Sequence, residues 1–530
     1  MKKVSTWREL TLREKIGQTV ILLSHPDKHI AKGGSIEKFL ERYPIGGLHC
    51  SGSEVKGFHM EANMKFPEVV AEYNKHLRVP LVGVADNGYF ATTHKIEFPI
   101  QMSLGAADDP ELAYRTGEFR AEDCKLSGIN WCFWPNADMP LSMHNPASGT
   151  RGTSDDPDLV YRMVREQLRA MKEHGVIPCI KHFPGSVNDC YVDLHLASLD
   201  SKFTREEWNA TAGEVYRRLF AEYAPSIMVG HHAIPSLQSD DVNGEYPPAT
   251  LSYDLTTKVL REELGFRGVT VTDALIMGGF VGKDPVDAAV RSFMAGNDVL
   301  LWPEVEYIDE MERRILADEI AIERLDEAVE RIWNLKKESG VLDGTVAPPA
   351  DVDEEFFRDI TRAVTEAGLT LVSDDDHLLP IDRERVKRVQ IVGVTPDDRE
   401  YEILTGLVRA FEKYGIEAKI RRNGWTTALA PLLEECDLML FAISRNVHRP
   451  MGPLDFWGSE ASTIWASNSL PKGKLMVACF GTPYLYRYYH KSRLPYVNAY
   501  SCSEEAVYAL VRAIVGEIPF RGKNPVKHLI

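Results

Sequence analysis

Eight short apolar runs, each followed by a longer segment with helical spacing, limit the fold of this sequence more than any other feature. The longer segments, for example 157–175 and 252–266, repeat apolar residues at helical intervals and carry charged faces. Alternating strands and helices are typical of parallel strands joined by crossover helices. Eight such units predict an α/β protein with a (β/α)8 TIM-like barrel. The predicted strands are 18–23, 45–49, 79–85, 129–134, 176–180, 226–230, 268–272 and 297–301.

A second alternation follows a closing helix over 320–340 and a stretch rich in Gly, Pro and Asp. Such a stretch is typical of a linker. The sequence therefore predicts a barrel domain over 1–342, a linker over 343–356 and a smaller doubly wound α/β sandwich domain over 357–530. The strands expected in the second domain are 369–373, 388–394, 417–421, 437–444, 474–481 and 496–500.

Charge and motif content exclude several classes of partner. A net charge of −17 and a pI near 5.5 give no basic surface for a phosphate backbone, so nucleic acid is not expected to bind. No G-x-G-x-x-G follows a strand of the second domain and no P-loop motif occurs, so nucleotide binding has no support.

No membrane partner is expected either. The N-terminus starts basic, but charges interrupt the apolar stretch that a signal peptide needs, and no later run is long enough for a membrane helix. We therefore expect a cytoplasmic protein that could form a homodimer.

Cysteine spacing predicts no metal site. The eight cysteines include no C-x-x-C pair, so neither a zinc site nor a disulfide framework is indicated. No metal and no other cofactor is expected.

Polar residues gather just after the predicted barrel strands. In a barrel of this kind the site is built by the loops that follow the carboxyl ends of the strands. The residues at these positions are Asp86, Asp138, Lys181, His182, His231 and Asp273. The loop 181–195, which also carries Asp193 and His195, would face the others.

Each of these residues also has a structural interpretation. Asp273 could cap the following helix, and Asp86-Asn87-Gly88 is a common turn sequence. His231 and His232 are adjacent, so on a strand they point to opposite faces and cannot chelate one metal as a pair.

Asp193 and His195 have a more specific spacing. In an extended segment residues i and i+2 point the same way, so the carboxylate can reach the ring N–H, orient the imidazole and favour its protonated form. A pair of solvated loop residues is the alternative.

Several ordered motifs across nearly the whole chain resemble glycoside hydrolase family 3. The most similar branch is that of the β-N-acetylglucosaminidases that carry their acid/base as a histidine-aspartate dyad on a barrel loop. In the first domain the motifs are GINWCFWPNADM, NPASGTRGTSDDPDLV, KHFPG, the Asp-x-His of 193–195, IMVGHHAIP, PPATLSYDLTTKVLREELGFRG, GVTVTDALIMGG and AGNDVLL. In the second domain they are AVTEAGLTLVSDDDHLLPI, CFGTPY and GEIPFRGKNPV.

The resemblance implies a role for each candidate residue. Asp273 would be the nucleophile, and His195, oriented by Asp193, would be the general acid/base. The sugar hydroxyls in the first subsite would be held by Asp86, Arg151, Lys181 and His182, with His231 and Asp138 lining or supporting that subsite.

General chemistry agrees with this allocation. A retaining glycosidase needs a carboxylate that attacks the sugar and a proton donor at the leaving oxygen, which later acts as base. A histidine with an ordinary pKa of about 6.5 can serve in both steps near neutrality. Ionised Asp273 would also stabilise a cationic transition state.

The sequence departs from the family pattern at three places. The usual Asp-Glu-Gly-Gly after the third strand is here Asp86-Asn87-Gly88-Tyr89, KHFPG is followed by Ser186-Val187, and Leu194 stands in the dyad where Ser is common. These departures concern the preference of the first subsite and what lies beyond it.

Four functions are compatible with these observations. The favoured one is an exo-acting β-N-acetylglucosaminidase that hydrolyses terminal β-linked N-acetylhexosamine in oligosaccharides such as cell-wall or chitin fragments. The second is a phosphorylase, because a neutral histidine in place of a carboxylate would not repel phosphate. The third is a β-glucosidase or β-xylosidase with a second-domain acid such as Glu460, against which the Asp193–His195 pair argues. The fourth is a sugar-binding protein without catalysis.

Overall fold

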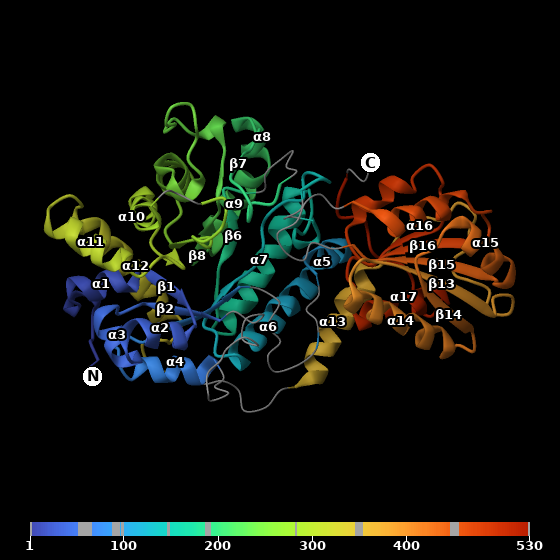
Figure 1. The fold of residues 1–530 in the computed structure, drawn as a ribbon, viewed down its shortest axis with the longest axis horizontal. Helices are drawn as coiled ribbons and strands as arrows, with labels where there is room; N and C mark the ends of the chain where they lie inside the picture. The colour runs from blue at the N-terminus through green and yellow to red at the C-terminus, as the bar shows by residue number, and fades with distance from the viewer. Residues whose placement is uncertain are drawn as a thin grey trace. The chain divides into compact units, whose positions relative to one another are not determined.

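A computed structural model describes residues 3–50, 66–86, 96, 100–145, 149–185, 192–280, 284–344, 353–445 and 455–527. By its internal contacts the chain divides into two compact units. The first unit comprises Met1–Lys95, Tyr114–Asp138 and Val164–Glu354. The second comprises Ile96–Ala113, Met139–Met163 and Glu355–Ile530. Figure 1 follows the chain from the N-terminus to the C-terminus.

The strands of the first unit are parallel and match the predicted runs. Among the described residues one sheet has six strands, in the order β11-β1-β2-β3-β4-β5, and another has three, in the order β10-β8-β6. The fifth predicted run appears as two strands that Cys179 separates. The bounds are β1 Val20–Leu23, β2 Gly47–Cys50, β3 Val82–Asp86, β4 Trp131–Phe133, β5 Ile177–Pro178, β6 Ile180–Phe183, β8 Ser226–Val229, β10 Val269–Thr272 and β11 Leu300–Leu301.

One additional pair of strands was not predicted. β7 (Leu199–Asp200) pairs in parallel with β9 (His232–Ala233). Each strand has only two residues, which is too short for an alternating pattern to mark it in the sequence.

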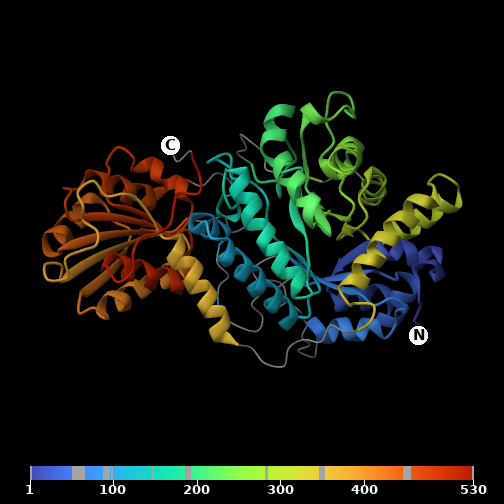
Figure 2. The same ribbon diagram turned by 180° about the vertical axis from the view of Figure 1, so that it is seen from behind.

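Helices separate these strands along the chain. α6 and α7 run side by side (Figures 1 and 2), where the Tyr114 hydroxyl donates to Glu173 at 2.6 Å. The bounds are α1 Leu12–Gln18, α2 Pro26–Gly33, α3 Ile36–Arg42, α4 Phe66–Asn74, α5 Gln101–Ala107, α6 Pro110–Leu126, α7 Pro157–Glu173, α8 Arg205–Ala210, α9 Ala212–Glu222, α10 Pro285–Ala295, α11 Tyr307–Leu316 and α12 Ile322–Glu338. Short 3₁₀ helices are η1 Trp7–Glu9, η3 Gly149–Arg151, η4 Pro235–Leu237 and η5 Ala249–Leu251.

Local sequence accounts for several helix ends. Thr11 and Glu14 form a capping box at the start of α1, and Thr204 and Glu207 form another at the start of α8. The segment predicted as a helix over 252–266 is helical, but its central part, η6 (Asp254–Glu263), is a π-helix.

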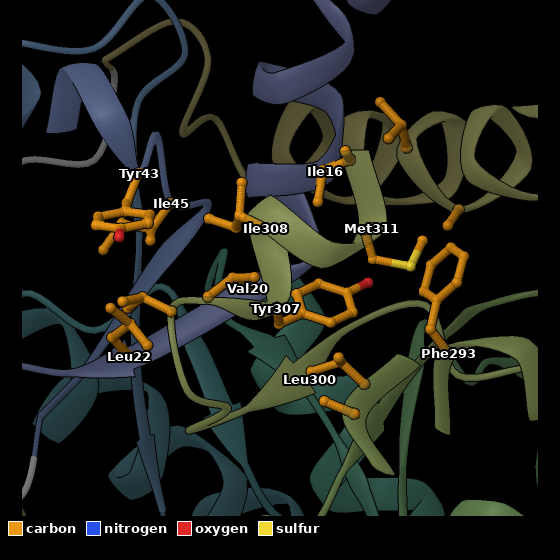
Figure 3. Close-up of a cluster of buried hydrophobic side chains, with 14 of the residues drawn as sticks. Ile16, Val20, Leu22, Tyr43, Ile45, Phe293, Leu300, Tyr307, Ile308 and Met311 are labelled. Carbon is orange, nitrogen blue, oxygen red and sulfur yellow. The ribbon is translucent and has the colours of Figure 1, made fainter. Parts of the chain in front are cut away.

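A large apolar cluster packs helices against the outer face of the first sheet. Figure 3 shows Val20 and Leu22 of β1 beside Tyr307, Ile308 and Met311 of α11. Ile21, between them in the strand, belongs instead to the cluster on the inner side of the sheets. Because β1 is buried on both faces, it is apolar throughout, as parallel strands usually are.

The second unit contains a mixed sheet. Its order in the described residues is β12-β17-β16-β15-β13-β14, in which only the β12–β17 pair is antiparallel. The bounds are α13 Glu354–Gly368, β12 Thr370–Ser373, β13 Arg388–Val394, α14 Asp398–Glu412, β14 Glu417–Arg422, α15 Thr426–Glu435, β15 Leu438–Ile443, α16 Gly458–Ser469, β16 Leu475–Cys479, η7 Pro483–Tyr488, β17 Tyr496–Asn498 and α17 Glu504–Ile514. All six predicted strands are present.

The two faces of this sheet are covered by different helices (Figure 1). In β15, Leu438, Leu440 and Ala442 belong to the cluster with α14 and α17. Met439 and Phe441 belong to the cluster with α15 and α16. The alternation follows from the two-residue period of a strand.

The segment between the two alternations lies partly outside the described residues, which omit 345–352. α13 begins at Glu354, so the last three residues of the predicted linker are helical. The predicted domain boundaries stay a prediction.

Two further observations concern the described residues as a whole. None of their helices combines the length and apolar character that crossing a lipid bilayer requires. Their seven cysteines are buried and unpaired by disulfides, and Cys190 lies outside the described residues.

A buried lysine joins α12 to the amino ends of three strands. Lys336 is 1% exposed, and its ammonium group donates to Gln18 Oε1, the Gly46 carbonyl and the Pro80 carbonyl, each at 2.8 Å. These acceptors precede β1, β2 and β3. Burial lowers the pKa of Lys336 to about 7.

We predict that Lys336→Met lowers the free energy of unfolding by about 1–3 kcal/mol, because two buried acceptors and one partly buried acceptor lose their donor. Urea denaturation would measure the change. Lys337→Met is the matched control, since Lys337 is exposed on the same helix, and it should change stability by less than about 0.5 kcal/mol. Equal stability of Lys336→Met and the unsubstituted protein would contradict the prediction.

Candidate active site

The candidate residues of the first unit lie at or just beyond the carboxyl ends of its parallel strands. Asp86 is the last residue of β3, Lys181 and His182 lie in β6, and Asp273 directly follows β10. Asp138 follows β4, and His231 lies between β8 and β9. Parallel pairing aligns these ends within each sheet, and the contacts of Asp138 with His182 and of Asp86 with Lys181 bring the ends of the two sheets together, as the sequence analysis expected.

Asp138 holds His182 at two atoms. Its Oδ1 accepts the His182 backbone N–H at 3.0 Å, and its Oδ2 lies 2.6 Å from His182 Nδ1. Asp138 is itself fixed through its backbone N–H, which donates to Asn136 Oδ1 at 2.7 Å. A carboxylate can only accept, so Nδ1 of His182 carries a proton and the ring orientation is set.

The other ring nitrogen of His182 faces Asp273, with Nε2 at 3.9 Å from Asp273 Oδ2. The Asp273 side chain is 20% exposed, and its Oδ1 accepts the Ala274 N–H at 2.8 Å. Burial by itself raises the pKa of Asp273, but the charge of His182 and the Ala274 N–H lower it, and the net shift is downward. Asp273 is therefore ionised near neutrality.

His231 supports the segment that follows Asp273. Its Nε2 lies 3.0 Å from the Ala274 carbonyl and its Nδ1 lies 2.9 Å from Thr250 Oγ1. Burial lowers the pKa of His231, so the ring is neutral, Nε2 donates to the carbonyl and Nδ1 accepts from the hydroxyl. His231 is buried, with 1% exposure, so it fixes the backbone beside Asp273 and does not line the surface of the site. The neighbouring His232 is also buried, which lowers its pKa to about 4.

Asp86 and Lys181 form an ion pair between β3 and β6. The Lys181 side chain is fully buried, whereas that of Asp86 is 47% exposed. The pair thus presents a carboxylate at the surface of the site and keeps its cation beneath. Asn87, Gly88 and Tyr89 lie outside the described residues, as do Ser186 and Val187.

Asp193 contacts His195 as expected, but within a turn and not in the extended segment that the i, i+2 argument assumed, since the Leu196 N–H donates to the Asp193 carbonyl at 2.9 Å. Asp193 Oδ1 accepts the His195 backbone N–H at 2.9 Å and lies 2.6 Å from its Nδ1. The Asp193 side chain is 1% exposed and that of His195 is 39% exposed. Nδ1 therefore carries a proton held by a buried carboxylate. His195 also lowers the pKa of Asp273, so the two side chains share one electrostatic environment.

Two predicted residues lie in the second unit. Arg151 ends η3, in a segment whose contacts belong to that unit. Glu460 is buried at the start of α16, and its Oε2 lies 3.7 Å from Arg445 Nη1. Burial raises the pKa of Glu460. The roles of both residues stay predictions.

The sequence analysis missed His49, the third residue of β2. Its ring lies edge-on to Trp302, with the ring centroids 5.1 Å apart. Burial lowers the pKa of His49 to about 4, while Asp86 raises it and Lys181 lowers it, so His49 lies near that ion pair. A histidine in an otherwise apolar strand, one residue before its end, was the available signal. No group of residues suited to a metal ion occurs in the described part of the chain.

Comparison with known proteins agrees with the fold and identifies the family. The family model described as "Glycosyl hydrolase family 3 N terminal domain" matches residues 11–335. A β-N-acetylglucosaminidase/β-glucosidase of Cellulomonas fimi is 30% identical over 98% of this chain and 94% of its own. A β-hexosaminidase A of Pseudoalteromonas piscicida is 26% identical over 71% of this chain and 67% of its own.

Two solved structures show the same fold. A β-glucoside phosphorylase bound to a ligand designated 2FGlc has a TM-score of 0.81 and 24% identity, over 98% of this chain and 95% of its own. A family 3 β-N-acetylglucosaminidase from Paenibacillus sp. str. FPU-7 has a TM-score of 0.78 and 23% identity, over 98% of this chain and 99% of its own. The extent of the family match and of the 30% identity shows that this chain is an enzyme of glycoside hydrolase family 3.

Proposed function

We propose that the protein is a retaining, exo-acting β-N-acetylglucosaminidase. One observation carries the proposal: the backbone that follows Asp273 contacts the backbone of His195, where the Gly278 N–H donates to the His195 carbonyl at 2.9 Å, and the His195 ring is held by buried Asp193. A carboxylate beside an oriented, partly exposed imidazole provides a nucleophile and a proton carrier in one site. The similarity over nearly its whole length to the Cellulomonas fimi enzyme supports the choice of substrate.

We also propose that the two parallel sheets of the first unit are parts of one (β/α)8 barrel. An isolated parallel bridge joins Val271 of β10 to Val299, just before β11. A second parallel bridge joins Asn136, beyond β4, to Lys181 of β6. Both support closure of the sheets around the inner cluster of apolar side chains.

In the first step Asp273 attacks the anomeric carbon, and the bond from that carbon to the leaving oxygen breaks. The proton from Nε2 of the His195 imidazolium passes to the leaving oxygen. The carboxylate of Asp193 favours the imidazolium electrostatically. Asp273 is then a neutral ester of the sugar. In the transition states before and after this intermediate its bond to the sugar is only partly formed, and the remaining negative charge of the carboxylate stabilises the cationic sugar.

In the second step neutral His195 takes a proton from water as the water oxygen bonds to the anomeric carbon. Asp273 leaves as a carboxylate, so the product keeps the β configuration. Asp86, Lys181 and His182 are the proposed partners of the sugar hydroxyls, and the role expected for Arg151 stays a prediction. Asp138 fixes His182, and His231 fixes the backbone next to the nucleophile.

Phosphate is the alternative acceptor in the second step. Neutral His195 takes the place that a carboxylate acid/base would occupy, so the site would not repel an anion there. Phosphorolysis would yield a sugar 1-phosphate. A cytoplasmic location and a homodimer remain predictions.

We predict the highest kcat/KM on nitrophenyl N-acetyl-β-glucosaminide in a panel that also contains the β-glucoside, the N-acetyl-β-galactosaminide and the β-xyloside. Each would be assayed with and without millimolar phosphate, and phosphate should not speed turnover. Faster reaction of the glucoside would overturn the substrate assignment. Phosphate-dependent formation of a sugar 1-phosphate would make the enzyme a phosphorylase.

Asp273→Ala should lower kcat by roughly 10³-fold or more while the protein stays folded, because a partly exposed carboxylate contributes little to packing. A 2-fluoro glycoside with a good leaving group should label Asp273 covalently, as mass spectrometry of peptides would detect. Label on another carboxylate, or a product of inverted configuration, would contradict the nucleophile assignment.

His195→Ala should lower kcat/KM on the β-linked disaccharide of N-acetylglucosamine by roughly 10²–10⁴-fold, because a sugar alkoxide needs a proton to leave. The loss should be much smaller for the rate of nitrophenol release, since nitrophenolate leaves unprotonated. Asp193→Ala should show the same pattern more weakly.

His76→Ala, which removes a histidine in the turn after α4, is the control for the His195 experiment and should keep the original activity. Equal losses on both substrates in His195→Ala would mean that another group donates the proton.

A further inference from the structure

The backbone that follows the nucleophile contacts the backbone that carries His195. We call residues 274–280 the glycine turn and residues 192–198 the acid/base loop. The Gly278 N–H donates to the His195 carbonyl at 2.9 Å. Within the turn, Met277 N donates to the Ala274 carbonyl at 3.0 Å, so the contact point is tied to the residue next to Asp273.

The contact leaves no room for side chains on the two glycines of the turn. A Cβ on Gly278 would lie 2.3 Å from the Leu196 carbonyl oxygen. A Cβ on Gly279 would lie 2.8 Å from the Leu194 oxygen and 3.0 Å from His231 Cβ. Neither glycine has a φ in the left-handed region, so space and not backbone conformation is what excludes a larger residue.

The far end of the acid/base loop is attached to the segment after β8. Ser198 Oγ donates to the His231 carbonyl at 3.2 Å, and Leu199 pairs with His232 in the β7–β9 ladder. The His231 ring in turn holds the Ala274 carbonyl. The outer side of the loop is open, with Leu196 56% exposed. The loop thus rests on the glycine turn with its backbone, with Asp193 buried and Leu196 exposed to solvent.

We propose that Gly278 and Gly279 are positioning residues for the reaction. Because they have no side chains, the backbone of the acid/base loop contacts the glycine turn directly, and this contact sets the distance between His195 and Asp273. This inference depends on the proposed function, in which His195 moves the proton. A methyl group at either glycine would lift the loop away from the turn. Proton transfer requires hydrogen-bond reach, and a displacement of about 1 Å costs on the order of 10²-fold in rate.

The effect of such a displacement depends on the leaving group. Asp273 directly precedes the turn and its Oδ1 accepts the Ala274 N–H, so it should keep its place, and a glycoside whose leaving group needs no proton should still react. A disaccharide, whose leaving oxygen must be protonated, should react slowly. Alanine at Gly278 should have the larger effect, because its Cβ would come closer to the loop.

The experiment compares Gly278→Ala, Gly279→Ala and Gly406→Ala with the unsubstituted enzyme. Gly406 is the matched control, since a Cβ there would meet Val507 Cγ1 at an ordinary 3.4 Å. The substrates are the disaccharide of N-acetylglucosamine and its 2,4-dinitrophenyl glycoside. For Gly278→Ala we expect kcat on the disaccharide to fall roughly 10–100-fold with little change in KM, and the single-turnover release of dinitrophenol to change by less than about 3-fold. Gly279→Ala should show the same split more weakly, and Gly406→Ala neither effect.

Equal losses on both substrates, or full activity of Gly278→Ala on the disaccharide, would overturn the inference. Thermal melting shows whether Gly278→Ala folds, and if it does not, the less crowded Gly279→Ala decides by the same two rates. His195→Ala is assayed in parallel. If His195→Ala loses no more activity on the disaccharide than on the dinitrophenyl glycoside, the proposed function itself is wrong. If His195→Ala shows that difference and both glycine variants lack it, only the positioning role is wrong.

Discussion

Parallel hydrogen bonding between neighbouring strands is the constraint on which the candidate site depends. β3 and β4 are parallel neighbours, as are β6, β8 and β10. Parallel pairing aligns the carboxyl ends within each sheet, and the contacts of Asp138 with His182 and of Asp86 with Lys181 join the ends of the two sheets. The residues brought together are nearly 190 positions apart in the chain, from Asp86 to Asp273. Each strand contributes one or two polar side chains at the point where its apolar run stops.

The charges at this edge occur in pairs that fix one another. Asp138 holds His182, Asp193 holds His195 and Lys181 holds Asp86. A buried charge without a partner would be costly, so these pairs both stabilise the site and set the direction of each ring. Asp273 has a different environment, in which histidines keep it ionised without a direct ion pair of normal hydrogen-bond length. Such a carboxylate can attack a sugar without first breaking a strong contact.

Backbone packing adds a second level of positioning. The acid/base loop and the glycine turn contact each other directly through backbone carbonyl oxygens and N–H groups, because Gly278 and Gly279 have no side chains to separate them. The opposite ends of the strands are fixed in another way, where Lys336 binds the segments before β1, β2 and β3. The site and its scaffold are thus held by groups that themselves take no part in the proposed chemistry.

Much of this arrangement could be predicted from the sequence, because period and residue type are local properties. The apolar runs determined the strands of both units, and the sequence also indicated the contact between Asp193 and His195, although the two residues meet in a turn and not in an extended segment. Other features depended on contacts between distant segments. Only the tertiary structure decided that Lys336 meets three carbonyl or amide oxygens, that His49 lies near Asp86, and that the segment of Arg151 packs with the second unit. The need for glycine at position 278 is of the same kind, because the atom that excludes a side chain there belongs to Leu196, more than eighty residues earlier in the chain.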